Sequence, residues 1–505
     1  MRPILSAAAI AMASYLIVAG LVGCAVGPDF KAPAAPAVTG FTPEKTLPDT
    51  AGTNGPHGVS QHFITDMDIP AQWWRVFHSE PLNRLIEQAI AANPNLAAAQ
   101  AALRQAQENA YAQRGSYFPI VTGAFNASRN LTPTASETPF SITGSPYYTL
   151  ITPQLNVSFV PDVFGANRRA VESLTALARN EEFQLEATYL TLTANVVTGV
   201  IQEASLRGQI AATLETVRVE SRLLNILRRQ QVLGQAAGAD VAAQEAALAQ
   251  AQLTLPPLQK QLAQQRDALT VLAGHFPSEA IAATFQLEDL ALPIDLPVSL
   301  PSKLVRQRPD VRAAEEMLHS ASALIGQAVA ARLPQIILTG DIGNSPTASG
   351  TFLVPGTNFW TIAGGITTPL FDFGTLLHKQ RAARAAFEQA GAQYRATVLS
   401  AFQNVTDALH ALQTDANALA SATAAGKAAA RSLSIVQRQL ALGQVAYLAL
   451  LNAQNAYQQV RLALVQADAN RLADTAALFQ ALGGGWWNLT DDQLATQGIS
   501  TSPTP

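Results

Sequence analysis

The sequence is poor in charge, has a single cysteine and contains no long apolar run after residue 23. Asp, Glu, Lys and Arg make up 13 % of the 505 residues, and the formal net charge is −4. A near-neutral chain with about half the usual charged content gives no reason to expect a nucleic-acid partner. The lone Cys24 excludes an internal disulfide bond. Any crossing of a membrane by the rest of the chain would need β-strands.

Motifs for catalysis and for metal or nucleotide binding are also missing. The seven histidines are scattered, and His319, which follows Glu315-Glu316, lacks the second histidine of a zinc motif. No Gly-x-Ser-x-Gly elbow and no phosphate-binding glycine loop with lysine is present. We therefore predict that the protein is not an enzyme and has no metal or cofactor, apart from a covalent lipid at its N-terminus.

The N-terminus has the pattern of a bacterial lipoprotein signal peptide. Residues 4–23 are small and apolar, and Leu21-Val22-Gly23-Cys24 forms a lipobox. We predict that residues 1–23 are removed and that Cys24 carries the lipid, since several acyl chains give an effectively permanent anchor. Ala25 follows, rather than aspartate, which permits export to the outer membrane. The alternative is an uncleaved transmembrane helix, because about 20 apolar residues can span a bilayer.

Most of the remaining sequence consists of two similar copies. In each copy two prolines bound an Ala-rich helical stretch with equal spacing, from Pro94 to Pro119 and from Pro309 to Pro334. The spacing from a Phe-Gly pair to a Leu-Gly-Gln turn is also equal, from Phe164 to Gly234 and from Phe373 to Gly443. Fixed helical lengths of this kind indicate a tandem duplication. The predicted organisation is an anchor and extended linker over 24–74, a first repeat over 75–290, a second over 291–485, and a loosely ordered tail over 486–505.

Four segments alternate between apolar and polar residues, as half-exposed strands do. The clearest is Ile151–Val160, and the others are Ile120–Arg129, Gln335–Asn344 and Phe359–Leu370. We predict that the apolar face (Leu155, Val157 and Phe159) meets lipid and that the polar face meets a lumen, lined by Gln154, Asn156 and Ser158. Segments 131–146 and 344–356 are predicted to be exposed loops. A soluble four-stranded sheet on a helical body is the alternative.

Four strands are too few to close a transmembrane barrel, since the smallest known have about eight. An open edge in lipid leaves backbone groups unpaired, at a cost of several kcal/mol each. If these strands cross a membrane, several copies of the chain must share one barrel. The sequence thus predicts an oligomer but not its copy number.

Two long segments without proline, Gly165–Leu233 and Gly374–Leu442, are predicted to be helices of roughly 100 Å. Each turns back at a glycine, Gly234 or Gly443, which fits the left-handed C-cap of a helix. Pro256-Pro257 should bend or restart the first return helix. We expect one long helix to pack against two shorter ones laid end to end, as part of a helical cylinder.

Taken together, these segments resemble the outer-membrane efflux factors of the TolC type, in the lipoprotein branch called NodT-like. The matching pieces are Cys24–Asp29, Trp73-Trp74, Asn93–Leu96, Pro161–Gly165, Arg306–Val311 and Leu370–Gly374. The resemblance implies a mainly α fold with a membrane β-barrel: a long α-helical barrel, four strands per chain, and a homotrimer that shares twelve strands. It also implies an outer-membrane location with the helices extending into the periplasm.

The same resemblance implies a passive exit duct for drugs or other toxic compounds. Its partners would be a periplasmic adaptor and, through it, an inner-membrane pump of the resistance–nodulation–division class. Two other functions stay open. The chain could serve a one-step secretion exporter, or it could be a periplasmic coiled-coil scaffold without a pore.

In this family the helix turns are the periplasmic tips, which dock the adaptor and close the pore. The resemblance assigns docking to Leu233, Gly234, Gln235, Leu442, Gly443, Gln444 and Val445. It assigns the aperture to Arg229, Asp240, Arg438 and Asn452. Two ordinary helix turns would satisfy the same local chemistry, and Asp240 could instead cap the return helix. Because Asn452 stands where relatives often carry aspartate, we expect a less cation-selective aperture.

Overall fold

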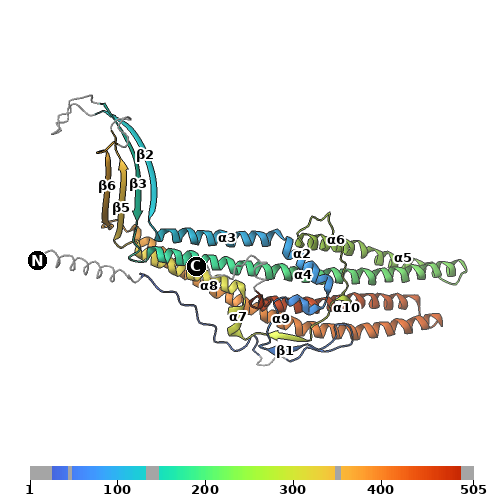
Figure 1. Ribbon diagram of the computed structural model, residues 1–505. Helices are drawn as coiled ribbons and strands as arrows, with labels where there is room; N and C mark the ends of the chain where they lie inside the picture. Colours follow the sequence, from blue (N-terminus) through green and yellow to red (C-terminus); the bar gives the residue numbers. More distant parts are fainter. Residues whose placement is uncertain (1–24, 44–47, 132–146, 347–353, 491–505) are drawn as a thin grey trace. The chain divides into compact units, whose positions relative to one another are not determined.

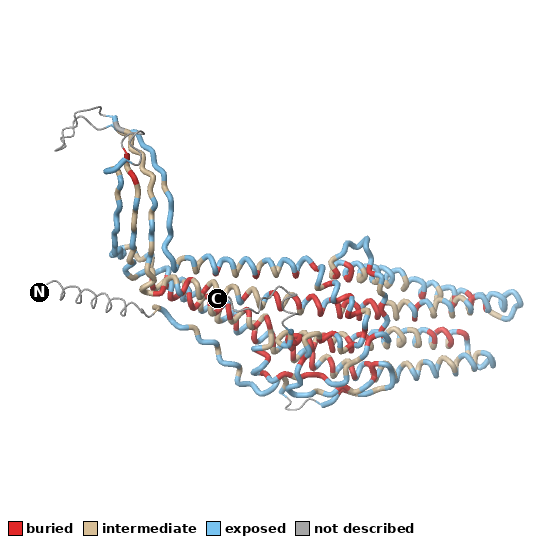
Figure 2. The backbone as a smooth tube through the Cα atoms, in the orientation of Figure 1, coloured by how far each residue is buried: buried red, intermediate tan, exposed pale blue. Residues whose placement is uncertain are grey.

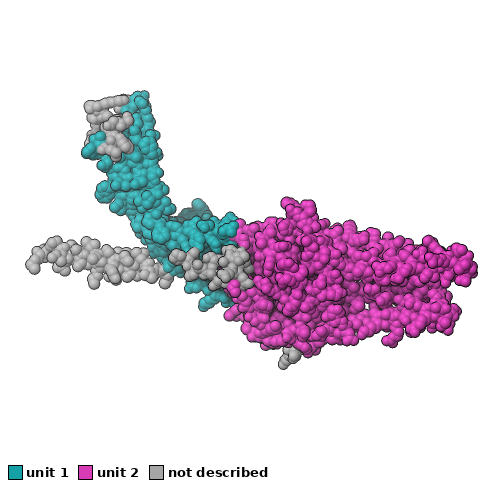
Figure 3. Space-filling model, turned by 45° about the vertical axis from the view of Figure 1, so that its right-hand side comes forward, with its two compact units in different colours: residues 1–33, 103–180, 314–394 teal, residues 34–102, 181–313, 395–505 magenta. Residues whose placement is uncertain are grey.

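The computed structural model describes residues 25–43, 48–131, 147–346 and 354–490 (Figure 1). Cys24 and most of the two predicted loops, 131–146 and 344–356, lie outside the described residues. The chain divides into two compact units, coloured separately in Figure 3. The first comprises Met1–Pro33, Leu103–Asn180 and Ala314–Tyr394, and the second comprises Ala34–Ala102, Glu181–Ala313 and Arg395–Pro505.

Two helices of equal length dominate the fold, as the equal spacings predicted. Helix α4 spans Ala166–Val232 and helix α9 spans Thr375–Ala441, and each has 67 residues. At 1.5 Å per residue, each is about 100 Å long. Neither contains proline, so the hydrogen-bond ladder runs uninterrupted. A glycine with positive φ follows each helix, which ends it at the predicted position.

Shorter helices accompany the long ones: α2 (Glu80–Ala92), α3 (Pro94–Arg114), α5 (Gly238–Leu253), α6 (Leu255–Leu272), α7 (Pro301–Gln307), α8 (Pro309–Ala330) and α10 (Tyr447–Ala481). The first return helix is indeed broken, and α6 restarts at Leu255 with Pro256-Pro257 in its first turn. Proline is tolerated there because the first N–H groups of a helix have no intrahelical acceptor. Among the described residues, no helix combines the length and apolar character needed to cross a membrane.

The first unit contains an antiparallel sheet of four strands in the order β2-β3-β5-β6. The strands are β2 (Ile120–Leu131), β3 (Tyr147–Phe159), β5 (Gln335–Asn344) and β6 (Asn358–Thr367). All four predicted strands are confirmed. Strand β6 ends before the predicted Leu370, because Pro369 has no N–H to donate to a neighbouring strand.

The larger share of the buried apolar side chains belongs to the second unit. Buried positions are red in Figure 2 and also occur on the helices of the first unit. Trp73 and Trp74 are almost fully buried, and Trp73 stacks on Phe479 with ring centroids 5.8 Å apart. The short strand β1 (His62–Thr65) pairs in parallel with β4 (Asp295–Val298). Within the segment 24–74, predicted as an anchor and extended linker, the chain thus also forms a short strand, and its last residues enter the core.

The loosely ordered tail was predicted to begin at residue 486, but the first residues of that range are packed. Gly483, Gly484 and Gly485 all have positive φ and turn the chain sharply after α10. The Trp486 ring then packs against Phe183, and its Nε1 donates to the backbone oxygen of Gln307 at 2.6 Å. The segment around Trp486 is thus part of the packed second unit, and residues 491–505 lie outside the described part.

Candidate channel surfaces and helical tips

The register of the sheet separates a polar from an apolar face. Residues that pair across neighbouring strands lie on the same face of a sheet. One cross-strand row is polar on every strand: Thr122, Asn156, Asp341 and Thr361. The adjacent row is apolar or glycine on every strand: Gly123, Leu155, Ile342 and Trp360. In these two rows the predicted alternation extends across all four strands.

The apolar face is open to its surroundings in the single chain. The exposed fraction is 52 % for Leu155, 60 % for Ile342 and 72 % for Trp360. On the other face, the Nε2 atom of Gln154 donates to Oδ1 of Asn156 at 2.7 Å, so these two predicted lumen residues lie side by side. Ser158, on the same face, is exposed. Asp341 adds a carboxylate to this face that the prediction had missed.

The sheet has two edges. Strands β2 and β6 each pair with a single neighbour among the described residues. An edge strand presents a row of N–H and C=O groups that are ready to pair with another strand. Both edges of this sheet can therefore accept a strand from a further chain.

The two predicted tips have the same backbone geometry. Gly234 and Gly443 have φ values of 74° and 69°. The N–H of Gln235 donates to the oxygen of Gln230 at 2.8 Å, and Gln444 donates to Gln439 at 2.9 Å. This six-to-one hydrogen bond, with the glycine one position earlier, is the Schellman C-cap. Each long helix thus ends in a defined turn rather than a frayed end.

Apolar side chains project from both tips. The exposed fraction is 70 % for Leu233 and 71 % for Leu442, and Val232 beside them reaches 87 %. Gln235 and Gln444 are also exposed, whereas Val445 is half-buried. A single exposed leucine is ordinary, whereas adjacent exposed apolar side chains, such as Val232 and Leu233, mark a candidate interaction surface. The ends of both hairpins are largely coloured as exposed in Figure 2.

The residues assigned to the aperture lie on or near the tip-proximal ends of the helices. Asp240 is in the first turn of α5, whose N-cap is Ala237, so the alternative of Asp240 as the cap is wrong. The Arg438 guanidinium donates to the backbone oxygen and Oγ of Ser434, one turn earlier on its own helix. Arg229 and Asn452 are exposed. In this single chain each of these four residues can still approach another molecule.

Each long helix and its return helix form a helical hairpin, α4 with α5 and α9 with α10. A buried series of hydrogen bonds, which the sequence did not predict, joins these two hairpins near their tips. The Tyr447 hydroxyl donates to Oε1 of Gln244 at 2.5 Å, and Nε2 of Gln244 donates to the carboxylate of Glu220 at 2.5 Å. These side chains are at most 8 % exposed. Tyr447 belongs to a buried hydrophobic cluster with Leu224, Leu227, Val241, Leu450 and Leu451. Burial raises the pKa of Glu220, while burial and the nearby carboxylates raise that of Tyr447.

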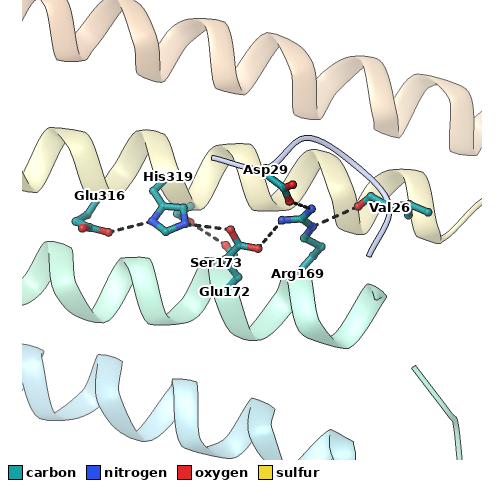
Figure 4. Close-up of polar contacts among 8 residues, drawn as sticks. Val26, Asp29, Arg169, Glu172, Ser173, Glu316 and His319 are labelled. Atoms are coloured by element: carbon teal, nitrogen blue, oxygen red, sulfur yellow. Dashed lines mark hydrogen bonds and ion pairs between the residues drawn. The ribbon is translucent and has the colours of Figure 1, made fainter. Parts of the chain in front are cut away.

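The segment that follows the predicted lipid site also has ordered polar contacts, shown in Figure 4. The Arg169 guanidinium on α4 donates to Asp29 at 2.7 Å and to Glu172 at 2.8 Å. On α8, both ring nitrogens of His319 face carboxylates, Glu172 at 3.0 Å and Glu316 at 3.3 Å. The sequence had shown His319 only as a histidine without a zinc-binding partner.

A sequence profile for the family described as "Outer membrane efflux protein" matches residues 85–275 and 300–484, which is most of the chain. The chain belongs to the outer membrane efflux protein family. The two matched segments correspond to the two copies seen in the sequence. Membership of this family confirms the predicted outer-membrane location and a role as the outer-membrane component of an efflux system.

Relatives match the efflux protein over nearly its whole length. It is 28 % identical to the antibiotic efflux pump outer membrane protein ArpC of Pseudomonas putida, over 95 % of this chain and 96 % of that one. It is 28 % identical to the cation efflux system protein CusC of Escherichia coli, over 94 % of this chain and 98 % of CusC. The solved structure of the Campylobacter jejuni CmeC outer membrane channel has a TM-score of 0.84, 22 % identity, and coverage of 95 % and 98 %. The solved structure of the outer-membrane channel OprN has a TM-score of 0.81 and 24 % identity, and the match covers 92 % of this chain and 100 % of that one. The predicted TolC-type fold, mainly helical with four longer strands in each chain, is thereby confirmed.

Proposed function

We propose that three copies of this chain form one efflux channel, in which each copy supplies four strands to a shared twelve-stranded barrel. The observation that carries this proposal is the sheet with a polar face, an exposed apolar face and two unpaired edges. Unpaired backbone groups cost several kcal/mol each in lipid, so β2 of one copy would pair with β6 of the next. Gln154, Asn156 and Ser158 would then line the lumen.

The lipid on Cys24 would be a second attachment to the outer membrane, in addition to the strands. The lipobox supports it, and the mature chain would begin at Cys24. Several acyl chains bury enough methylene groups, at about 0.8 kcal/mol each, for effectively permanent anchoring. No other cofactor enters this proposal.

The tips would dock a periplasmic adaptor that joins the channel to an inner-membrane pump of the resistance–nodulation–division class. The exposed Leu233 and Leu442, each held by a fixed glycine turn, support this assignment. The pump would supply the energy, and the channel would be a passive duct. A ring of three Asn452 side chains is polar but uncharged, which would make the aperture less selective for cations.

The substrates would be drugs or other toxic compounds. Relatives are named for efflux of antibiotics and toluene, and these proteins match almost the whole chain. A second candidate is export of a product that the cell makes itself. It is supported by 27 % identity over 447 residues to the pyoverdine export outer membrane protein OpmQ of Pseudomonas putida.

Native mass spectrometry of the detergent-solubilised protein tests the assembly, with a trimer as the expected species. A monomer that conducts ions in a lipid bilayer would contradict the shared barrel. Two adjacent positions of β3 provide a matched test of the faces. Asn156→Cys should react with a charged, membrane-impermeant thiol reagent, and Val157→Cys should resist it. Equal reaction at both positions would mean that β3 does not separate lipid from lumen.

A further inference from the structure

Residues Ala25–Phe30 contact two helices: Asp29 binds Arg169 of α4, which belongs to the first repeat, and Phe30 stacks on His319 of α8, which belongs to the second. Figure 4 shows Val26 and Asp29 beside Arg169. The two helices also touch each other directly, because the hydroxyls of Ser173 and Ser320 are 2.8 Å apart and buried. The N-terminal segment thus lies on a helix pair that is already joined by polar contacts.

On the α4 side, the segment is held by its backbone and by one ion pair. The N–H of Val26 donates to the oxygen of Phe164 at 3.1 Å, and Nε of Arg169 donates to the oxygen of Val26 at 3.3 Å. The Arg169 side chain is only 5 % exposed, and its other nitrogens bind Asp29 and Glu172. Binding several acceptors in a fixed fork is a property of arginine that lysine does not share.

On the α8 side, the fit depends on two glycines and one ring stack. Gly27 has a φ of 100° and lies against Gly326, with no room for a Cβ on either residue. A Cβ on Gly326 would lie 2.7 Å from the oxygen of Val26 and 2.8 Å from Cγ of Arg169. The Phe30 ring stacks on His319, with centroids 4.3 Å apart and planes 13° from parallel.

We propose that residues 25–30 are a docking peptide, whose receptor is formed by the adjoining faces of α4 and α8 and whose role is to fix the N-terminus of the mature chain in one register. Glycine packing at Gly27, the ion pair of Asp29 and the ring stack of Phe30 each need their own residue type, so a shift by one residue would misplace all three together. Because the peptide touches a helix of each repeat, it also holds the two copies together at this point.

Docking fixes where the proposed lipid emerges, and this consequence rests on the proposed lipidation of Cys24. One peptide bond separates Cys24 from Ala25, and a Cβ on Gly165 would lie 2.6 Å from that of Ala25. Gly165 stands between the end of β3 and the start of α4. The lipid would therefore leave the protein beside the junction between strand and helix, rather than at the end of a free tether.

A photo-crosslinking residue tests docking in the full-length protein in its own membrane. Phe30 is replaced by p-benzoylphenylalanine, and mass spectrometry identifies the crosslinked peptide after irradiation. We expect a crosslink within one chain, from position 30 to the segment of α8 that contains His319. Asp29→Ala should lower its yield several-fold, and the Asp29 side chain is 89 % exposed, so folding should survive. Gly326→Ala should abolish it, because the added Cβ occupies the place of the peptide backbone.

Matched controls separate docking from general damage. Gly391→Ala on α9 adds the same methyl where the nearest atom is 3.8 Å away, and Asp66→Ala removes another exposed aspartate from an ion pair. Both controls should leave the crosslink unchanged. If the wild-type chain gives no crosslink, or if Asp29→Ala and Gly326→Ala both leave its yield intact, the docking peptide does not exist as proposed. Labelling of Cys24 with a palmitate analogue tests the lipid separately, since loss of either signal alone identifies which proposal has failed.

Discussion

Glu186 on α4 should make the folded protein less stable as the pH rises. Its side chain is 2 % exposed, and neither carboxylate oxygen has a hydrogen-bond partner among the described residues. Burial, helped by the nearby charge of Glu182, raises the pKa of Glu186 from 4.5 to about 8. A folded pKa above the unfolded one means that folding favours the protonated carboxyl group. The associated stability is present below about pH 4.5 and is lost as the pH rises through about 8.

The size of the effect follows from the two pKa values. Each pKa unit corresponds to about 1.4 kcal/mol, so the cost of burying this carboxyl group is about 1 kcal/mol at pH 5 and about 3 kcal/mol at pH 7. A loss of about 2 kcal/mol per chain between these pH values is large against the usual 5–15 kcal/mol of a domain. Because Glu186 is buried within a single chain, assembly should not remove the effect.

The measurement is the thermal or denaturant midpoint of the purified protein between pH 5 and 8, for wild type and two variants. Glu186→Gln keeps the shape but cannot ionise, so its midpoint should fall less steeply with rising pH. Glu215→Gln on the same helix is the control, since that side chain is 40 % exposed and lies beside arginines. The reasoning fails if wild type and Glu186→Gln show parallel pH profiles.

Three further changes test the channel, the tips and the anchor. Val157→Arg, on the apolar face of β3, should destabilise membrane insertion by about 2–4 kcal/mol if the residue lies near the bilayer midplane, and so lower the amount of inserted protein. Normal insertion would mean that this face does not meet lipid. Gly234→Val combined with Gly443→Val should strain both turns by roughly 1–2 kcal/mol each. Because nothing lies within 4 Å of either position, trimers should persist while drug susceptibility rises and crosslinking from Gln444→Cys to the adaptor falls. Unchanged efflux and crosslinking would remove the tips as the docking surface. Cys24→Ser should abolish labelling by a palmitate analogue, and equal labelling would end the lipoprotein proposal.

The elements predicted well from the sequence are those specified by local signals. Alternation in Ile151–Val160 identifies a strand because side chains of a strand have a period of two. Gly234 and Gly443 identify helix ends because few other residues adopt positive φ without strain. Two segments of equal length with no proline then predict α4 and α9 to within a residue at each end. None of these inferences needs knowledge of which segments touch.

The features that were missed depend on contacts between distant residues. Strands β1 and β4 are four residues each, too short for a periodic signal, and their pairing joins His62–Thr65 to Asp295–Val298. Glu186 looks in the sequence like any acidic residue on a helix surface. The series of hydrogen bonds from Tyr447 through Gln244 to Glu220 connects three helices, so it forms only once the register between the two hairpins is set. Sequence periodicity alone does not specify that register.

The equal length of α4 and α9 limits how the chain can change over generations. One residue inserted into either helix would displace its turn by about 1.5 Å and rotate everything beyond it by about 100°. The tip would no longer stand level with its counterpart, and Tyr447 would lose its alignment with Gln244. A viable length change must therefore alter both long helices and their return helices together, as a rare coordinated event. The connections between paired strands are free of this requirement, so insertions and deletions among descendants of this chain should accumulate there.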